Sequence, residues 1–176
     1  MASLSWSDLL IDSISPEQFE SWLSPWVGVL TGNVAPAFMT RFGDWYLHRP
    51  EGHIDRFSVI TGQCVRVADS HADLVQLINS AQGREGLLLA SLVSELHDAG
   101  KVPGEGQCYA LAPHPALGGP DPYAGAAVQA RFVMVTDVVV WQSICAQSLA
   151  GRIAASPAPV DEPAPAKRKW WGFGRN

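Results

Sequence analysis

The residues best suited to chemistry lie in one stretch, GEGQCYALAPHPALGGPDPY, at positions 104–123. Cys108 and His114 are the residue types of a thiol–imidazole pair, in which the imidazole takes the thiol proton and leaves a nucleophilic thiolate. They are six residues apart in a segment that predicts a strand followed by a loop, so they meet only if the loop folds back. A cysteine in an apolar strand usually belongs to the core. Catalysis by this pair is therefore the less favoured alternative.

Two histidines near a carboxylate form a second candidate site. His48 and His53 flank a predicted hairpin turn and Asp55 follows, so a metal ion could bridge the two strands through imidazole and carboxylate ligands. Histidines are also common on exposed hairpins. The glycines at 104 and 106 precede a strand and lack the Gly-Lys-Ser/Thr ending of a phosphate loop, and the three cysteines form no CxxC pair. We expect no catalytic residue, metal or cofactor.

The same stretch has a simpler interpretation as a rigid loop. Gly118 and Gly119 permit backbone conformations that other residues avoid, and the prolines between 113 and 122 restrict the chain. A stiff loop that ends in an aromatic residue, Tyr123, suits recognition of another protein better than catalysis.

The surrounding segments predict the elements that position these residues. The run 43–67 alternates apolar and polar residues around turns near 50–52 and 61–62, which is typical of an antiparallel meander. Ser15, Pro16 and Gln18 form a capping pattern for the first main helix. We expect an α+β fold, a single domain with a mainly antiparallel sheet flanked by amphipathic helices. The sheet should also contain strands 107–111 and 133–141, and the helices should span 16–24, 71–81, 85–99 and 144–155.

The chain is expected to divide into a globular domain, 1–155, and a Pro/Ala-rich disordered tail, 156–176. The tail ends in KRKWWGFGRN, whose cations and indole rings favour at most a weak contact with an anionic membrane surface. No apolar run approaches the length of about 20 residues that spans a bilayer. The N-terminal residues lack the basic start of a secretory signal. These features predict a cytoplasmic protein.

Charge is unevenly distributed along the chain. The net charge is −5, yet residues 1–40 contain four acids and no Lys or Arg, and the last 14 residues contain four bases and no acid. Without those four bases, 8 basic side chains would face 17 acidic ones, which gives a charge near −9. An acidic body repels nucleic acid and attracts basic proteins. The acidity is also compatible with a role in solubility alone.

Several motifs resemble a known family. They are FGD at 42–44, the Thr-Gly turn at 61–62, GEGQCY at 104–109 and PALGG at 115–119, followed by a terminal strand and helix in MVTDVVVWQSICAQSLAG. Over residues 35–152 the chain resembles the C-terminal, Tdi-type domain of type VI secretion immunity proteins, which is often joined to a GAD-like domain. The chain lacks a long GAD-like region, its N-terminal helices are short, and PDPYAGAAVQAR looks like a local insertion.

The resemblance implies a cytoplasmic immunity protein that binds and neutralises a cognate bacterial toxin, often a nuclease, by occluding its active site. A protein-binding adaptor without a toxin partner is the alternative, and an enzyme using Cys108 and His114 is the least favoured one. No direct contact with nucleic acid is expected. The acidic meander and the glycine-rich loop supply the candidate partner-binding residues, which are Asp44, Trp45, His48, Glu51, Asp55, Asp121 and Tyr123.

Overall fold

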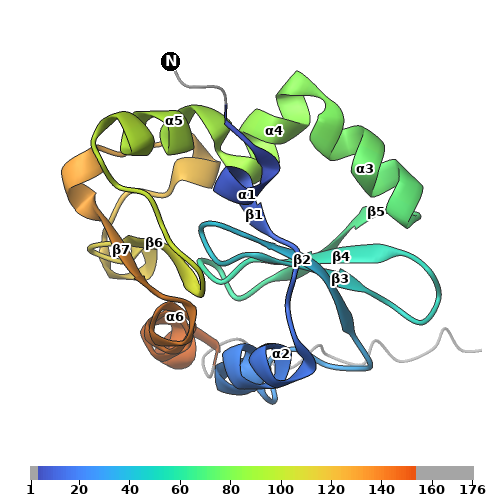
Figure 1. The fold of residues 1–176 in the computed structure, drawn as a ribbon. Coiled ribbons are helices and arrows are strands. Elements are labelled where there is room, and N and C mark those ends of the chain that lie inside the picture. The colour runs from blue at the N-terminus through green and yellow to red at the C-terminus, as the bar shows by residue number, and fades with distance from the viewer. Residues whose placement is uncertain (1–3, 154–176) are drawn as a thin grey trace, which may run out of the picture.

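The computed structural model describes residues 4–153, which form an α+β fold (Figure 1). The tail expected at 156–176 lies outside the described residues. A five-stranded sheet has the order β1-β2-β3-β4-β5, and every neighbouring pair is antiparallel. Its strands are β1 (Leu10–Ile11), β2 (Ala35–Thr40), β3 (Trp45–His48), β4 (Ile54–Phe57) and β5 (Cys64–Ala68).

The meander predicted for 43–67 is confirmed as β3, β4 and β5, but the other two predicted strands do not join this sheet. The strands β6 (Gln107–Leu111) and β7 (Val133–Asp137) pair with each other as a separate two-stranded sheet. A backbone hydrogen bond of 2.7 Å runs from the Tyr109 N–H to the Arg41 carbonyl. Because Arg41 lies in the turn after β2, this contact does not extend into a ladder.

The strand predicted over 133–141 is too long. After β7 the chain enters the helix α6 (Val138–Ile153), so the run of valines at 138–140 is helical. β-branched residues favour strands, but this preference is weak beside burial. Val138, Trp141 and Cys145 are buried while Val139 and Val140 are 40% and 43% exposed, which is the spacing of one helical face. Burial of that face outweighs the local preference.

The helix predicted over 85–99 is instead two helices. α4 (Ala81–Leu88) and α5 (Ala90–Asp98) are separated at Leu89, whose φ of 54° is left-handed. α4 also begins earlier than predicted, because Ser80 caps it by accepting a hydrogen bond from the N–H of Gly83. Gly83 lies inside the helix, where a Cβ would approach the Leu77 carbonyl oxygen to 1.9 Å. Only glycine permits this close packing of α4 on α3 (His71–Asn79).

The N-terminal helices follow the sequence prediction closely. α2 (Pro16–Leu23) starts with the predicted capping box, in which Ser15 accepts from the Gln18 N–H and Gln18 accepts from the Ser15 N–H. It is preceded by the short α1 (Trp6–Leu9) and followed by a 3₁₀ turn, η1 (Ser24–Trp26), at the expected proline. Three more 3₁₀ turns interrupt the loop between β6 and β7: η2 (Pro115–Leu117), η3 (Pro122–Ala124) and η4 (Ala130–Phe132).

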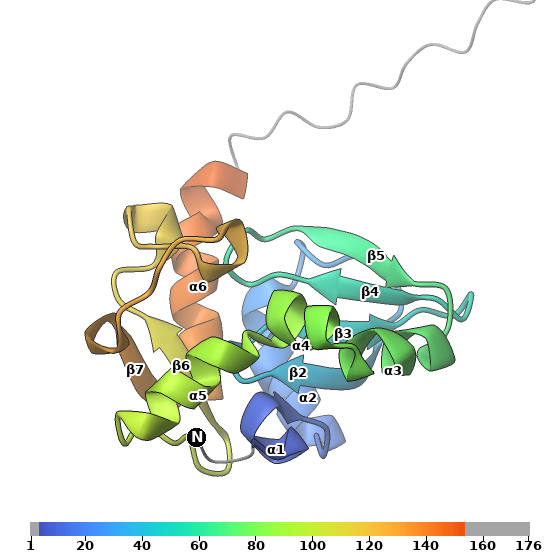
Figure 2. The same cartoon turned by 90° about the horizontal axis from the view of Figure 1, so that it is seen from above.

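Helices cover both faces of the larger sheet. In Figure 1, α2 lies below the sheet and α3 and α4 lie above it, and Figure 2 shows the same layers from above. α6 runs beside α2, and the β6–β7 pair with α5 completes the other end of the molecule. None of the helices described within 4–153 is long and apolar enough to cross a bilayer. The largest fully buried side chains include Trp26, Phe42, Trp45, Tyr46, Phe57, Tyr109 and Trp141.

Candidate partner-binding surface

Cys108 and His114, the candidate thiol–imidazole pair, are both buried. Cys108 is fully enclosed in β6, and this burial raises the pKa of its thiol. A nucleophilic cysteine needs the opposite shift. His114 uses Nδ1 to accept a hydrogen bond of 3.0 Å from the Ala116 N–H, and its ring lies 5.6 Å from that of Trp141. These contacts give the histidine a role in shaping the η2 turn.

The histidines around the hairpin do not converge. Nε2 of His53 lies 3.4 Å from Oδ1 of Asp55, while the ring of His48 stacks on His71 with centroids 5.3 Å apart. Burial and the neighbouring His71 lower the pKa of His48. Within the described residues, no group of three or more His, Cys, Asp or Glu side chains is placed to hold a metal ion.

Asp44 and Trp45 do not fit their expected role as partner contacts, because both are completely buried. The Asp44 carboxylate accepts hydrogen bonds from Nε and Nη2 of Arg56, at 3.0 and 2.5 Å, and from the N–H of Val59 at 3.0 Å. Trp45 donates its indole N–H to Oε1 of Gln142 at 3.2 Å. These two residues hold β3 to β4 and to α6, so their role is structural.

Asp55 is also used inside the protein. Its Oδ2 accepts a hydrogen bond of 2.7 Å from Nε of Arg49, and the residue is only 8% exposed. The sequence pattern of a hairpin carboxylate could not distinguish this internal ion pair from a surface charge. Asp55 is therefore unavailable for a strong contact with a partner unless its bond to Arg49 opens.

The remaining expected residues lie at two ends of the larger sheet. Glu51 is exposed in the β3–β4 turn, with the half-buried His48 beside it. Asp121 and Tyr123 belong to the β6–β7 loop, where Asp121 lines a depression with Thr61 from the opposite, β4–β5 turn. A partner that contacts Asp121 therefore approaches the end of β4 opposite to Glu51. The meander and the loop do not form the single patch that the sequence predicted.

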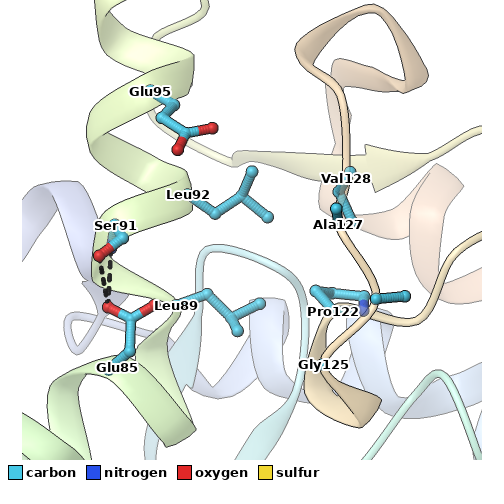
Figure 3. Close-up of a pocket in the computed structure, with 10 residues that line it drawn as sticks. Glu85, Leu89, Ser91, Leu92, Glu95, Pro122, Gly125, Ala127 and Val128 are labelled. Carbon is cyan, nitrogen blue, oxygen red and sulfur yellow. Dashed lines mark hydrogen bonds between the residues drawn. The ribbon is translucent and has the colours of Figure 1, made fainter.

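The β6–β7 loop instead faces α5 across a hollow of about 300 Å³ (Figure 3). Leu92 points from the helical side toward Ala127 and Val128 of the loop, and Leu89 points toward Pro122. Two carboxylates, Glu85 and Glu95, lie on the helical side. The full lining is Glu85, Leu89, Ser91, Leu92, Glu95, Pro122, Gly125, Ala126, Ala127 and Val128.

The two carboxylates of this hollow differ in their bonding. Glu85 accepts hydrogen bonds from the N–H and hydroxyl of Ser91, at 3.0 and 2.7 Å, and so caps the start of α5. Glu95 is exposed and its side chain points toward the gap in Figure 3. Sequence reasoning missed both. The available signal was that Glu95 lies one helical turn after Leu92, on the edge of the apolar stripe.

The charged surface is strongly unbalanced, because most cations bond inward. Arg41 donates to the backbone carbonyls of Ser7, Gly104 and Gln107, and Lys101 donates to those of Ala130 and Val133. Over residues 4–150, the basic side chains classed as exposed are those of Arg66, Arg84 and Arg131. The acidic ones are Asp12, Glu17, Glu20, Glu51, Asp69, Asp73, Glu85, Glu95, Asp98, Glu105 and Asp137.

A scan against protein-family models finds no model that matches this chain. A search of the curated proteins finds no significant match either.

Proposed function

We propose that this chain is an immunity-type protein that binds a cognate type VI secretion toxin in the cytoplasm and neutralises it by covering the toxin's active site. The observation that carries the proposal is the hollow between α5 and the β6–β7 loop, which combines leucines with two carboxylates. Such a site suits a Lys or Arg of a partner, because the aliphatic stem packs on apolar atoms while the charged head meets a carboxylate.

The positions of the family-like motifs support this proposal. Gly43 of FGD has a φ of 94°, and a Cβ there would lie 2.8 Å from Cδ1 of Trp141. Two side chains of α6 donate hydrogen bonds to this turn. The Trp141 indole N–H donates to the Phe42 carbonyl and the Gln142 amide donates to the Gly43 carbonyl, both at 2.8 Å. The FGD motif thus forms the turn against which α6 packs. A resemblance in such positions concerns the fold first, so the motifs support the toxin-binding role by analogy with the family, beside the hollow that carries the proposal.

The other motifs also have structural positions. Gly104 and Gln107 of GEGQCY bond each other around the turn into β6. In PALGG, a Cβ on Gly119 would meet the Pro113 carbonyl oxygen at 1.9 Å. The backbone at Gly119 therefore packs directly against the start of the same loop. The loop that carries these constraints is the same one that forms the wall of the hollow. A loop held in this way presents a preformed surface, which reduces the entropy lost on binding.

The exposed charge supports a basic protein as the partner. Acidic side chains far outnumber basic ones on the described surface, so a toxin with a positively charged active-site cleft, such as a nuclease, would associate rapidly. The same charge opposes binding of the chain itself to nucleic acid. Burial raises the pKa of the Cys108 thiol, which disfavours it as a nucleophile, and we propose that the chain acts by binding.

The proposal is tested by expressing the chain in bacterial cells together with the protein encoded beside its gene. The neighbouring protein alone should stop growth, and this chain should restore growth and co-purify with its neighbour. Glu95→Lys should slow association of the purified pair by about tenfold, as expected for reversal of a charge at an interface edge. Asp12→Lys makes the same change of charge at an exposed carboxylate outside the hollow and should leave the rate nearly unchanged.

Failure of the chain to bind or protect against any toxic product of its own gene neighbourhood would overturn the proposal. Binding without protection would favour an adaptor. Equal effects of Glu95→Lys and Asp12→Lys would show that the chain binds its partner through another surface.

A further inference from the structure

A second concave surface lies on the other helical layer, between α2, η1 and residues 27–34. It encloses about 340 Å³ and shares no lining residue with the hollow of Figure 3. Val27 is 84% exposed, so part of this apolar wall is open to solvent. Phe19, Leu23, Leu30 and Val34 of the same wall are half-buried, so the exposed apolar surface is contiguous, and contiguous apolar patches mark interaction sites more often than single exposed residues do. We call this concave surface the α2 groove. Its lining residues are Phe19, Glu20, Leu23, Ser24, Trp26, Val27, Leu30, Gly32 and Val34.

The edge of the α2 groove is acidic. Glu20 lines it, and Glu17 is exposed one turn earlier on α2. No Lys or Arg occurs between residues 4 and 40. Arg49, which directly follows β3, donates to the Thr31 carbonyl at 2.6 Å, but its charge is paired with Asp55. The groove therefore favours an occupant that carries both apolar surface and positive charge.

The sequence of this chain contains such an occupant. Residues 167–176, KRKWWGFGRN, combine four cations with Trp170, Trp171 and Phe173. A Trp ring offers a large apolar area with few rotatable bonds, which makes it an efficient anchor in an apolar groove. The cations on both sides of the rings match the carboxylates on α2.

The 13 residues between the end of α6 and this segment are enough to reach the α2 groove. Ser24 of the groove also lines a depression that continues along α6 to Ala150, close to the end of that helix at Ile153. Residues 154–166 can span at most about 40 Å, at roughly 3.3 Å per residue. That reach is comparable to the diameter of a domain of this size, so residues 167–176 can arrive at the groove from α6.

We propose that residues 167–176 dock in the α2 groove of the same chain, with the indole rings on Phe19, Leu23 and Val27 and the cations beside Glu17 and Glu20. Docking within one chain is aided by an effective concentration on the order of 1 mM. The segment covers the apolar groove and neutralises part of the acidic surface around α2.

Chymotrypsin tests this docking in the full chain, because it cleaves after the three aromatic residues that would be covered. Mass spectrometry follows loss of the C-terminal fragment with time. Val27→Arg places a charge in the groove and should speed cleavage about tenfold. Val65→Arg is the matched control, since Val65 is 52% exposed on β5, outside the groove, and should leave the rate unchanged. Neither change creates a new chymotrypsin site.

A second variant keeps the test independent of any effect of Val27→Arg on folding. Glu20→Lys changes an exposed side chain and should also speed cleavage, while Asp98→Lys, at the end of α5, should not. Raising sodium chloride from 50 to 500 mM should speed cleavage of the wild-type chain because it screens the ion pairs. Equal rates in all variants would overturn the proposal. Protection of the segment only by phosphatidylserine vesicles would overturn it in favour of a membrane contact.

Discussion

The guanidinium of Arg56 lies over the ring of Tyr123, 4.1 Å from its centroid, and connects the larger sheet to the β6–β7 loop. The same guanidinium donates to the buried carboxylate of Asp44. Burial alone would lower the pKa of Arg56, but the Asp44 charge outweighs it and the net pKa is raised. Arg56 therefore stays charged and joins the turn between β2 and β3, β4 and η3 in one contact.

Arg56→Met should destabilise the protein by about 3–5 kcal/mol, because it leaves the Asp44 carboxylate buried without its partner. The free energy of unfolding is measured in urea. Arg66→Met is the control, since Arg66 pairs with Asp69 on the exposed surface. Such a pair contributes at most about 1 kcal/mol. Similar decreases in the free energy of unfolding of the two variants would show that the buried Asp44–Arg56 pair contributes no more stability than a surface pair.

Asp44 illustrates what the sequence could and could not predict about this site. The meander around it was predictable, because alternating apolar residues and turn residues identify antiparallel strands. The burial of the carboxylate was not, because its partners Arg56 and Val59 lie 12 and 15 residues away on another strand and turn. A charged residue in a turn is exposed in most proteins, and only the tertiary structure reveals an internal pair.

Gly43→Ala should destabilise the protein by about 2–4 kcal/mol. The substitution costs strain at a φ of 94° and forces a Cβ against Trp141. Gly86→Ala in α4 is the opposite case, because nothing lies within 4 Å of its Cβ position. There alanine should stabilise by up to about 1 kcal/mol through helix propensity. Thermal unfolding of both variants checks the pair of predictions. If Gly43→Ala left the stability unchanged, the close packing of α6 on Gly43 would be contradicted.

The helical segments show a second limit of sequence reasoning. The capping residue Ser15 was predictable because a cap is a local hydrogen-bonding device. The break at Leu89 was missed because leucine is a good helix former and nothing near it signals a left-handed residue. The hollow was missed for a different reason, because it exists only when α5 and the β6–β7 loop face each other in the folded chain.

Cys108→Ser should cost about 1–3 kcal/mol of stability, because a hydroxyl replaces a thiol in a fully buried position. Binding and protection by the folded variant should be unchanged, since the thiol does no chemistry in the proposed function. Calorimetric stability and a growth-rescue assay are compared on the same preparation. Loss of protection at full stability would restore Cys108 as a catalytic candidate.

The pH dependence of stability should include a contribution from His48. Its pKa in the folded protein lies below the ordinary value of about 6.5, so the unfolded chain binds a proton first as the pH falls. The stabilising contribution is therefore complete above pH 6.5, declines as the pH drops through that value, and levels off below the folded pKa. NMR titration of the His48 ring measures the folded pKa directly.

His71→Ala separates the two causes of this shift. Burial is the larger cause and the neighbouring imidazole the smaller, so the substitution should raise the pKa of His48 only part of the way toward 6.5. His97→Ala removes a histidine from α5 and serves as the control. An unchanged pKa in His71→Ala would mean that the stacked ring does not influence the titration.

Deletion of residues 157–176 should leave the proposed toxin neutralisation intact. The proposed toxin site lies between α5 and the β6–β7 loop, whereas the proposed docking site of the tail is the α2 groove, and the two share no lining residue. The four cations of the tail also oppose a basic toxin, so their removal should keep or slightly increase the association rate. The measurement compares growth rescue and stopped-flow association for the full and shortened chains. A shortened chain that folds normally but no longer protects cells would place the tail in the interface and contradict this separation of the two sites.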